Sequence, residues 1–390
     1  MDLEFTVEDR RFREEVADWL RANVPKDPRP PEGAEARAFD CAWQRKQYDG
    51  GWAGISWPLE YGGRGFTAQR QFIWHEEYSK ARAPTIGMGL IGITHAGPIL
   101  ILEGDAAQKS AHLGPILRGE AIWCQGFSEP NAGSDLASLK TKAVIDGEHL
   151  VVTGQKVWTS FGQFADYQEL LVRTDPKAPK HQGISWVVCD MRLPGIDVRP
   201  LELMSGGTHF CEVFYDEVRI PVTQIVGGLN QGWRVSLATL SLERGTSFIA
   251  DQLELLNKVE ALIQYAKEHP APGGRKTAYE DDEIRRSLAI VRAEVAALRA
   301  MTLATISRIE TEGKPGPEAS MIRLYFSTLY QRILRLAMEI LGPSRVVMSP
   351  LQQGFTQPYL RQFSATIAGG SAQIQREIIA GRVLGLPKSR

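Results

Sequence analysis

A polar segment in the middle of the chain could bind an anion. Residues 127–135 read Phe-Ser-Glu-Pro-Asn-Ala-Gly-Ser-Asp, so a turn rich in Pro, Asn and Gly lies between Ser128 and Ser134. Such a turn brings successive backbone amides together, and the two hydroxyl groups add donors, so a pyrophosphate could be bound without a lysine. The alternative is a polar loop that only joins a helix to a strand, and the sequence leaves both open.

A second segment, residues 154–160, reads Gly-Gln-Lys-Val-Trp-Thr-Ser at the end of a predicted strand. Trp158 could pack on a flat cofactor ring and Ser160 could hydrogen-bond to the edge of that ring. The competing interpretation is that Trp158 is an ordinary aromatic residue of the core.

A third candidate is the carboxylate of Glu243, near the start of a predicted helix that follows Gly232. Steps of three and four residues place it on one face with small and apolar side chains, namely Ser236, Thr239, Leu240, Ser247 and Ala250. A helical glutamate is ordinarily exposed to solvent. A small-residue surround is also what a general base beside a bound substrate requires.

The fourth segment, residues 367–376, contains Gly369 and Gly370 before a predicted helix. Two glycines permit a close backbone approach to a ligand, and the first amides of the helix have no partner within it. A plain loop followed by a helix cap would look the same.

The predicted secondary structure that positions these residues changes twice along the chain, from helical to β and back to helical. Helical spacing predominates up to about Gly119, and Thr6 is expected to cap the first helix. Short β-like runs follow to about Val226, with a hairpin expected at Asp146 and Gly147. Helical spacing then returns, with an apolar face at Leu255, Val259, Leu262 and Ala266.

We therefore predict an α+β multidomain protein with helical residues 1–120, a compact antiparallel β domain over residues 121–231 and helical residues 232–390. Further helices are expected at residues 38–49, 68–80, 284–309, 318–341 and 371–384.

Composition excludes several classes of function. The chain has 390 residues, of which 43% are hydrophobic, enough for two or three domains with a large core. Lys and Arg total 45 against 46 Asp and Glu, so no basic field is available to attract nucleic acid. The four cysteines form no CxxC pair, which argues against a zinc site or a disulfide framework and favours a reducing cytoplasm.

One uncharged and mostly apolar stretch, Ala83 to Leu102, has the length of a membrane span. Gly87, Gly89, Gly92, Gly97 and Pro98 interrupt it, and His95 would have to lie in lipid, so a buried helix of a soluble core is the better interpretation. The acidic amino terminus does not indicate export. His95 could line a ligand pocket or could be an ordinary core residue.

In this order and at these separations, the segments resemble the acyl-CoA dehydrogenase family over nearly the whole chain. The motifs that carry the resemblance are SEPNAGSD, GQKVWTS and GSAQIQREIIAGR. The resemblance implies an N-terminal α-helical domain, a middle β-barrel domain and a C-terminal α-helical bundle, usually assembled as a homotetramer or dimer.

The resemblance also implies FAD as cofactor and assigns residues to it. The flavin and its pyrophosphate would be contacted by Gln125, Phe127, Ser128, Gly133 and Ser134, the isoalloxazine ring by Trp158 and Ser160, and the rest of the pocket by Ser371 and Gln373. Expected contacts to the acyl-CoA substrate are Arg244, Ser134 and His95.

Many family members keep the catalytic glutamate just before the glycine of the last motif, where this chain has Gly369. Members that resemble isovaleryl-CoA and long-chain acyl-CoA dehydrogenases place it in the LER motif, which implies that Glu243 is the base here. The amide of Gly369 would still donate to the thioester oxygen. The implied reaction is α,β-dehydrogenation, with an electron-transfer flavoprotein as acceptor.

Two alternatives remain open, an acyl-CoA oxidase that uses O2 and a non-catalytic subunit paired with a catalytic homologue. Two departures from the family pattern are compatible with the second. Residues 275–279 read Arg-Lys-Thr-Ala-Tyr where Arg and Phe of an R-x-T-F-G pattern cover the FAD of a neighbouring subunit, so this contact of Arg275 is in doubt. Residues 339–343 read Glu-Ile-Leu-Gly-Pro in place of a glutamine and two glycines near the adenine.

Overall fold

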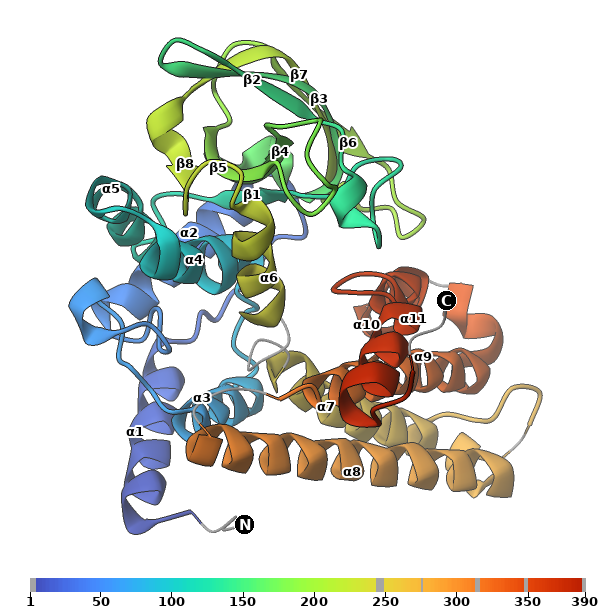
Figure 1. Cartoon of the computed structure of the whole chain (residues 1–390). Coiled ribbons are helices and arrows are strands. Elements are labelled where there is room, and N and C mark those ends of the chain that lie inside the picture. Colours follow the sequence, from blue (N-terminus) through green and yellow to red (C-terminus); the bar gives the residue numbers. More distant parts are fainter. Residues whose placement is uncertain (1–4, 243–248, 275, 313–315, 347–349, 388–390) are drawn as a thin grey trace. The chain divides into compact units, whose positions relative to one another are not determined.

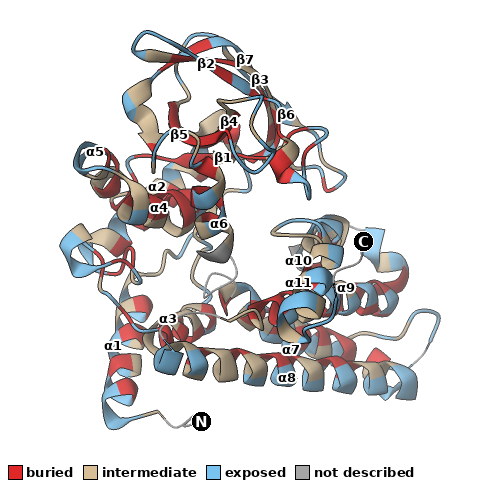
Figure 2. Ribbon diagram, in the orientation of Figure 1, coloured by how far each residue is buried: buried red, intermediate tan, exposed pale blue. Residues whose placement is uncertain are grey.

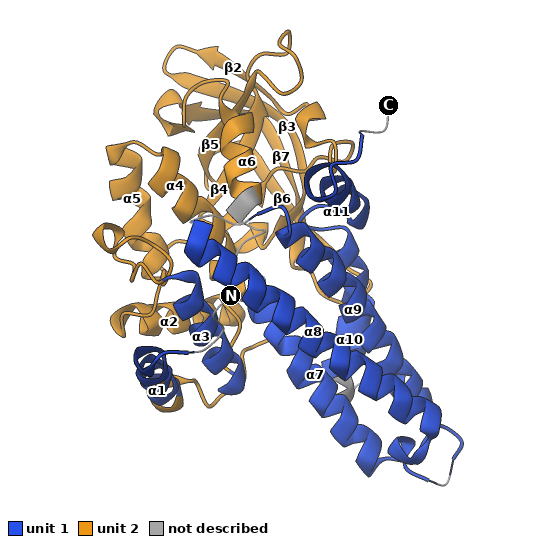
Figure 3. Ribbon diagram, turned by 60° about the horizontal axis from the view of Figure 1, so that its bottom comes forward, with its two compact units in different colours: residues 1–20, 67–82, 244–390 blue, residues 21–66, 83–243 orange. Residues whose placement is uncertain are grey.

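The chain folds into two compact units in a computed structural model that describes residues 5–242, 249–274, 276–312, 316–346 and 350–387 (Figure 1). Unit 1 comprises residues 1–20, 67–82 and 244–390, and unit 2 comprises residues 21–66 and 83–243 (Figure 3). Each unit therefore combines segments that are far apart in the sequence.

Unit 2 is built on an eight-stranded sheet with the order β6-β7-β3-β2-β4-β5-β8, in which β1 pairs with β4. The strands are β1 (Trp123–Gly126), β2 (Lys142–Asp146), β3 (His149–Ser160), β4 (Tyr167–Arg173), β5 (Ile184–Asp190), β6 (Ile196–Leu201), β7 (Phe210–Pro221) and β8 (Ile225–Val226). The predicted hairpin is confirmed, because β2 and β3 pair antiparallel from Asp146 and His149 and Gly147 has a φ of +57°.

Alternating side chains of the long strands form a core on one face of the sheet. In β7 the buried positions include Cys211, Val213 and Tyr215, with exposed or half-buried residues between them. This alternation lets the segment pair as a strand with one face in the core.

Four helices of unit 2 are α2 (Gly33–Asp49), α4 (Gly97–Glu103), α5 (Ala106–Leu117) and α6 (Gly232–Leu242). They share a second core with the sheet, at which Trp57, Trp123 and Trp186 are fully buried. Large aromatic side chains of this kind each remove roughly 150–250 Å2 from water when they are buried.

The apolar stretch from Ala83 to Leu102 is buried in part, but it is not one continuous helix. A π-helical turn, Gly92–Ala96, precedes α4, and Gly97 packs so closely on Trp57 that a Cβ atom there would lie 2.0 Å from the ring. Glycine at this position is thus required by packing. Within the described residues, no helix has both the length and the apolar character needed to cross a membrane.

Unit 1 contains most of α1 (Val7–Asn23), together with α3 (Ala68–Lys80), α7 (Ile249–Glu268), α8 (Asp282–Glu312), α9 (Ala319–Leu341), α10 (Pro350–Arg361) and α11 (Ala372–Ile378). The predicted apolar face of α7 is confirmed, since Leu255, Val259, Leu262 and Ala266 are all buried in a core shared with α8 and α9. Figure 2 shows buried and exposed residues along the helices of this unit. Thr6 caps α1 as expected, because its Oγ1 accepts from the Asp9 amide at 3.1 Å.

The three predicted structural classes and their order, helical, β and helical, are confirmed. The expected helix at residues 371–384 is shorter than predicted, because α11 ends at Ile378 and continues as a π-helical turn, Ile379–Val383.

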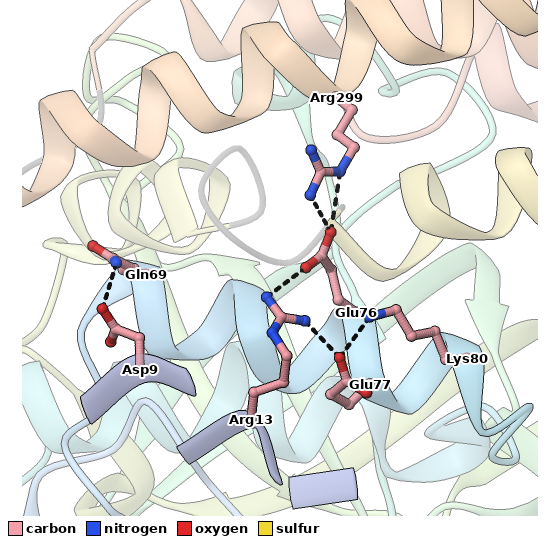
Figure 4. A network of polar contacts seen from close by, with 7 residues as sticks. All are labelled: Asp9, Arg13, Gln69, Glu76, Glu77, Lys80 and Arg299. Carbon is pink, nitrogen blue, oxygen red and sulfur yellow. Dashed lines mark hydrogen bonds and ion pairs between the residues drawn. The ribbon is translucent and has the colours of Figure 1, made fainter. Parts of the chain in front are cut away.

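A polar network ties α1, α3 and α8 of unit 1 together (Figure 4). Glu76 of α3 accepts from Nη2 of Arg13 at 2.9 Å and from Nε of Arg299 at 3.0 Å. The adjacent Glu77 accepts from the same Arg13 and from Lys80. Because the Glu76 side chain is only 9% exposed, these bonds replace lost hydration.

We expect Glu76→Gln to lower the free energy of unfolding by about 2 kcal/mol, because it leaves two partly buried arginines without their shared carboxylate. We expect a smaller loss of stability than for a fully buried ion pair, because the Arg299 side chain is 41% exposed and solvent screens its charge. Urea denaturation followed by circular dichroism measures the change.

The matched control is Glu283→Gln, which removes an exposed ion pair with Arg286 and should change stability by less than about 0.5 kcal/mol. Equal effects of the two substitutions would show that the network has no special role.

Candidate active site

A buried ion pair joins the two motifs of the middle segment. Lys156, from the second motif, is fully buried and its Nζ lies 2.9 Å from Oε1 of Glu129, in the first motif. The same Nζ donates to the carbonyl oxygen of Phe127 at 3.0 Å, and the amide of Val157 donates to the carbonyl of Ser128. The loop and the strand are thus held as one structure.

The carboxylate of Glu129 has further donors that keep it ionised. The amides of Lys140 and Thr141 donate to its two oxygens at 2.6 and 2.8 Å. Burial alone would raise the pKa of Glu129, but the Lys156 ammonium and these hydrogen bonds outweigh it and hold that pKa below its usual value. Burial lowers the pKa of Lys156 to about 8, against the opposing effect of Glu129.

The turn that Glu129 anchors leaves backbone donors open. Glu129 and Ala132 exchange two backbone hydrogen bonds of 3.0 Å, which close the turn. Among the described residues, no acceptor contacts the amides of Gly133 and Ser134, which are both exposed. A Cβ atom at Gly133 would meet nothing within 4 Å, so the approach to these amides is open. The arrangement suits an anion bound by backbone N–H groups.

Trp158 lies on the surface, so the interpretation as a core aromatic is wrong. Its side chain is 58% exposed and its backbone has a φ of +62°, a conformation that bulky residues rarely adopt. A register shift between Lys156 and Thr159 in the pairing with β7 turns it outward. Such strain at an exposed aromatic side chain is typical of a functional site.

Gln125 of β1 belongs to a buried polar cluster with two other residues of unit 2. Its Nε2 donates to Oε1 of Glu169 at 2.8 Å and lies 3.3 Å from Nδ1 of His95. His95 is 8% exposed and Glu169 is fully buried. His95 is therefore a core residue in the π-helical turn, in contact with an expected flavin ligand.

The remaining expected cofactor residues are placed as follows. Phe127 is buried in the core of unit 2, whereas Ser128 and Ser160 are half-buried near the two motifs. In unit 1, the hydroxyl of Ser371 caps α11 by accepting from the Ile374 amide at 3.3 Å, and Gln373 is exposed.

Glu243 and Arg244, the expected base and CoA partner, lie outside the described residues, and so does Arg275. Unit 1 does contain a pocket of about 520 Å3 between α3, α7 and α8, with Phe72, Leu256 and Val295 among its lining residues. Ile249, which also lines it, follows Glu243 by six positions in the sequence. The pocket is of the size that binds small molecules.

Sequence reasoning missed Glu129 and Lys156 as a pair. Both lie inside the quoted motifs, but their contact spans 27 positions along the chain. A signal was available for Lys156, because a charge within a predicted strand must be paired if it is buried. Glu169, which precedes Leu170, Leu171 and Val172 in β4, carried the same signal.

We expect Lys156→Met to lower the free energy of unfolding by about 3–5 kcal/mol, since it leaves the Glu129 carboxylate buried without its cation. Glu129→Gln should also destabilise, and the double substitution should cost less than the sum of the two. Denaturation measured by tryptophan fluorescence tests all three proteins. Lys180→Met, which removes an exposed ion pair with Asp135, is the control. If the double substitution cost as much as the sum of Lys156→Met and Glu129→Gln, the pairing would be contradicted.

Three family models match the chain: the N-terminal domain of acyl-CoA dehydrogenase over residues 6–120, the middle domain over 124–218 and the C-terminal domain over 230–384. Acyl-CoA dehydrogenase IpdE1 of Mycobacterium tuberculosis is 34% identical over 97% of this chain and 97% of its own length.

Solved structures give the same result. One named Tcur3481-Tcur3483 steroid ACAD is 29% identical with a TM-score of 0.88, and each chain is covered completely. The ChsE4-ChsE5 complex from Mycobacterium tuberculosis is 30% identical with a TM-score of 0.85, again over 100% of both chains. With three family models and full-length relatives in agreement, the chain belongs to the acyl-CoA dehydrogenase family, a family of oxidoreductases.

Proposed function

We propose that this protein catalyses the α,β-dehydrogenation of an acyl-CoA thioester to the trans-2-enoyl-CoA. The observation that carries the proposal is that one ion pair, Lys156 with Glu129, joins two features. These are the strand that exposes Trp158 in a left-handed backbone conformation and the turn with the open amides of Gly133 and Ser134. A flat ring and an anionic linker could be bound together there.

FAD fits these residues, and when bound it supplies the acceptor for the hydride that leaves Cβ. Trp158 and Ser160 would hold the ring, and the turn with Ser128 and Ser134 would hold the pyrophosphate. The Nε2 of Gln125 is engaged with Glu169, so Gln125 presents its carbonyl oxygen and would accept a hydrogen bond from the cofactor.

Proton removal requires a base and a polarised carbonyl together, because the Cα of a thioester is a weak acid. Glu243 is the proposed base, which takes the Cα proton. The N–H of Gly369 is the proposed donor to the thioester oxygen, and Arg244 the proposed partner of the CoA portion.

The proposed substrate has a bulky acyl group. One similar structure is named a steroid acyl-CoA dehydrogenase, which supports this choice. The pocket of unit 1 also exceeds what a short straight chain would fill, and it is lined by Ile249, close to Glu243 in the sequence.

We further propose assembly with a homologous subunit and reoxidation by an electron-transfer flavoprotein. Two similar structures are named as pairs of different proteins, which favours a heteromer over the homotetramer of the general family pattern. A cytoplasmic location stays a prediction; all four cysteines are free thiols, which is compatible with it.

Anaerobic titration of the purified flavoprotein with a panel of acyl-CoAs, from butyryl-CoA to a steroid side-chain thioester, tests the function. We expect bleaching of the flavin by the bulky thioester and little by butyryl-CoA. Glu243→Gln should retain FAD but slow bleaching roughly 100- to 10,000-fold, the usual contribution of a general base.

Glu260→Gln, an exposed residue of α7, is the control and should bleach at the wild-type rate. Undiminished bleaching in Glu243→Gln would refute the assignment of the base. Rapid peroxide formation in air would favour an oxidase, and absence of bleaching by any thioester, with poor flavin retention, would favour a non-catalytic subunit.

A further inference from the structure

Two buried side chains hold three successive carbonyl groups of the loop before α11. Arg323 of α9 is 6% exposed, and its Nη2 donates to the carbonyl oxygen of Ala368 at 2.8 Å. Gln375 of α11 is 1% exposed, and its Nε2 donates to the carbonyls of Gly369 and Gly370 at 3.1 and 3.3 Å. The backbone of this loop is therefore fixed from its carbonyl side.

A peptide unit is planar, with its C=O and N–H groups pointing in opposite directions. The bond from Arg323 to the Ala368 carbonyl therefore fixes the direction of the Gly369 N–H, which belongs to the same peptide unit. The bonds from Gln375 fix the next two units in the same way.

The local backbone of the loop favours glycine. Gly369 and Gly370 have φ values of +63° and +88°, in the left-handed region. A Cβ atom at Gly370 would lie 2.7 Å from Nε2 of Gln375, which shows how closely the side chain encloses the loop.

The N–H groups of the two glycines differ from that of Ala368, which donates to the carbonyl of Ser364 at 2.8 Å. Across the described residues, no acceptor contacts the amides of Gly369 and Gly370, although the carbonyls of the same residues and of Ala368 are all engaged. Gly369 is half-buried, so its N–H is available to a ligand.

We propose that Arg323 is a positioning residue that aims and polarises the Gly369 N–H for the thioester oxygen, with Gln375 as its second support. The guanidinium is charged, and a charged donor on the carbonyl oxygen strengthens the N–H at the other end of the peptide unit as a donor. The inference rests on the proposed function, because it explains what orients the Gly369 N–H, the donor that polarises the thioester carbonyl for proton removal.

Substitution of Gln375 is expected to disturb the stability of the protein little. The Oε1 of Gln375 is buried and accepts no hydrogen bond from any described residue. Gln375→Met therefore loses two donated bonds but also removes an unsatisfied buried oxygen, and the released carbonyls are half-buried and can bond to water. We expect its Tm to change by less than about 3 °C.

The test is isotope-edited infrared spectroscopy of [1-13C]oct-2-enoyl-CoA at saturating concentration on the full-length holoprotein. In the wild type, hydrogen bonding should shift the thioester carbonyl band below its frequency in solution. Arg323→Met and Gln375→Met should move the band back towards that frequency, and Arg323→Lys, which keeps charge and donor, should restore much of the shift. Arg323→Met should also lower kcat about 10- to 100-fold with little change in KM.

Arg332→Met, which removes an exposed ion pair of α9 with Glu294, is the control and should leave the band in place. A shifted band in the wild type that stays unchanged in both Arg323→Met and Gln375→Met would overturn the inference and leave the proposed function intact. An unshifted band in the wild type would overturn the donor role of Gly369 and the positioning role together, whereas flavin bleaching by acyl-CoA would still test dehydrogenation by itself.

Discussion

The candidate cofactor site depends on the ion pair between Lys156 and Glu129. An ion pair of this kind is costly to bury, and its Coulombic attraction repays the lost hydration only if the remaining lone pairs and protons are also satisfied. Further bonds of this kind are present here, because Lys156 also bonds to the Phe127 carbonyl and Glu129 accepts two backbone amides. The pair fixes the turn that presents Gly133 and Ser134 and the bulged strand that presents Trp158.

In both units a buried cation binds a backbone carbonyl beside a proposed ligand site: Lys156 binds the carbonyl of Phe127 in unit 2, and Arg323 binds that of Ala368 in unit 1. Backbone amides cost no reorganisation when charge develops on a bound group, provided that the loop is already rigid. A buried cation at the back of each loop supplies that rigidity.

Much of the fold could be predicted from the sequence because local patterns decide it. The stripe of Leu255, Val259, Leu262 and Ala266 defines a helix face, and Asp146 with Gly147 defines a hairpin. The broken helix before α4 could not be predicted, because its π-helical turn depends on the close approach of Gly97 to Trp57, which is 40 positions away.

The site was predicted as a list of residues rather than as a geometry. Motif resemblance named Trp158 and Gly369, but not Lys156, Glu169, Arg323 or Gln375, whose roles come from contacts between distant segments. Lys156, Glu169 and Arg323 are buried charges and Gln375 is a buried amide, so each needs a hydrogen-bond partner. The sequence alone does not identify that partner.

A crystal structure of the protein with FAD and an acyl-CoA bound would test the central claim most directly. The account predicts the flavin ring against Trp158, its pyrophosphate on the amides of Gly133 and Ser134, and the thioester oxygen within hydrogen-bond distance of the Gly369 N–H with the carboxylate of Glu243 facing Cα. A flavin bound elsewhere, or a Glu243 side chain directed into solvent, would contradict it.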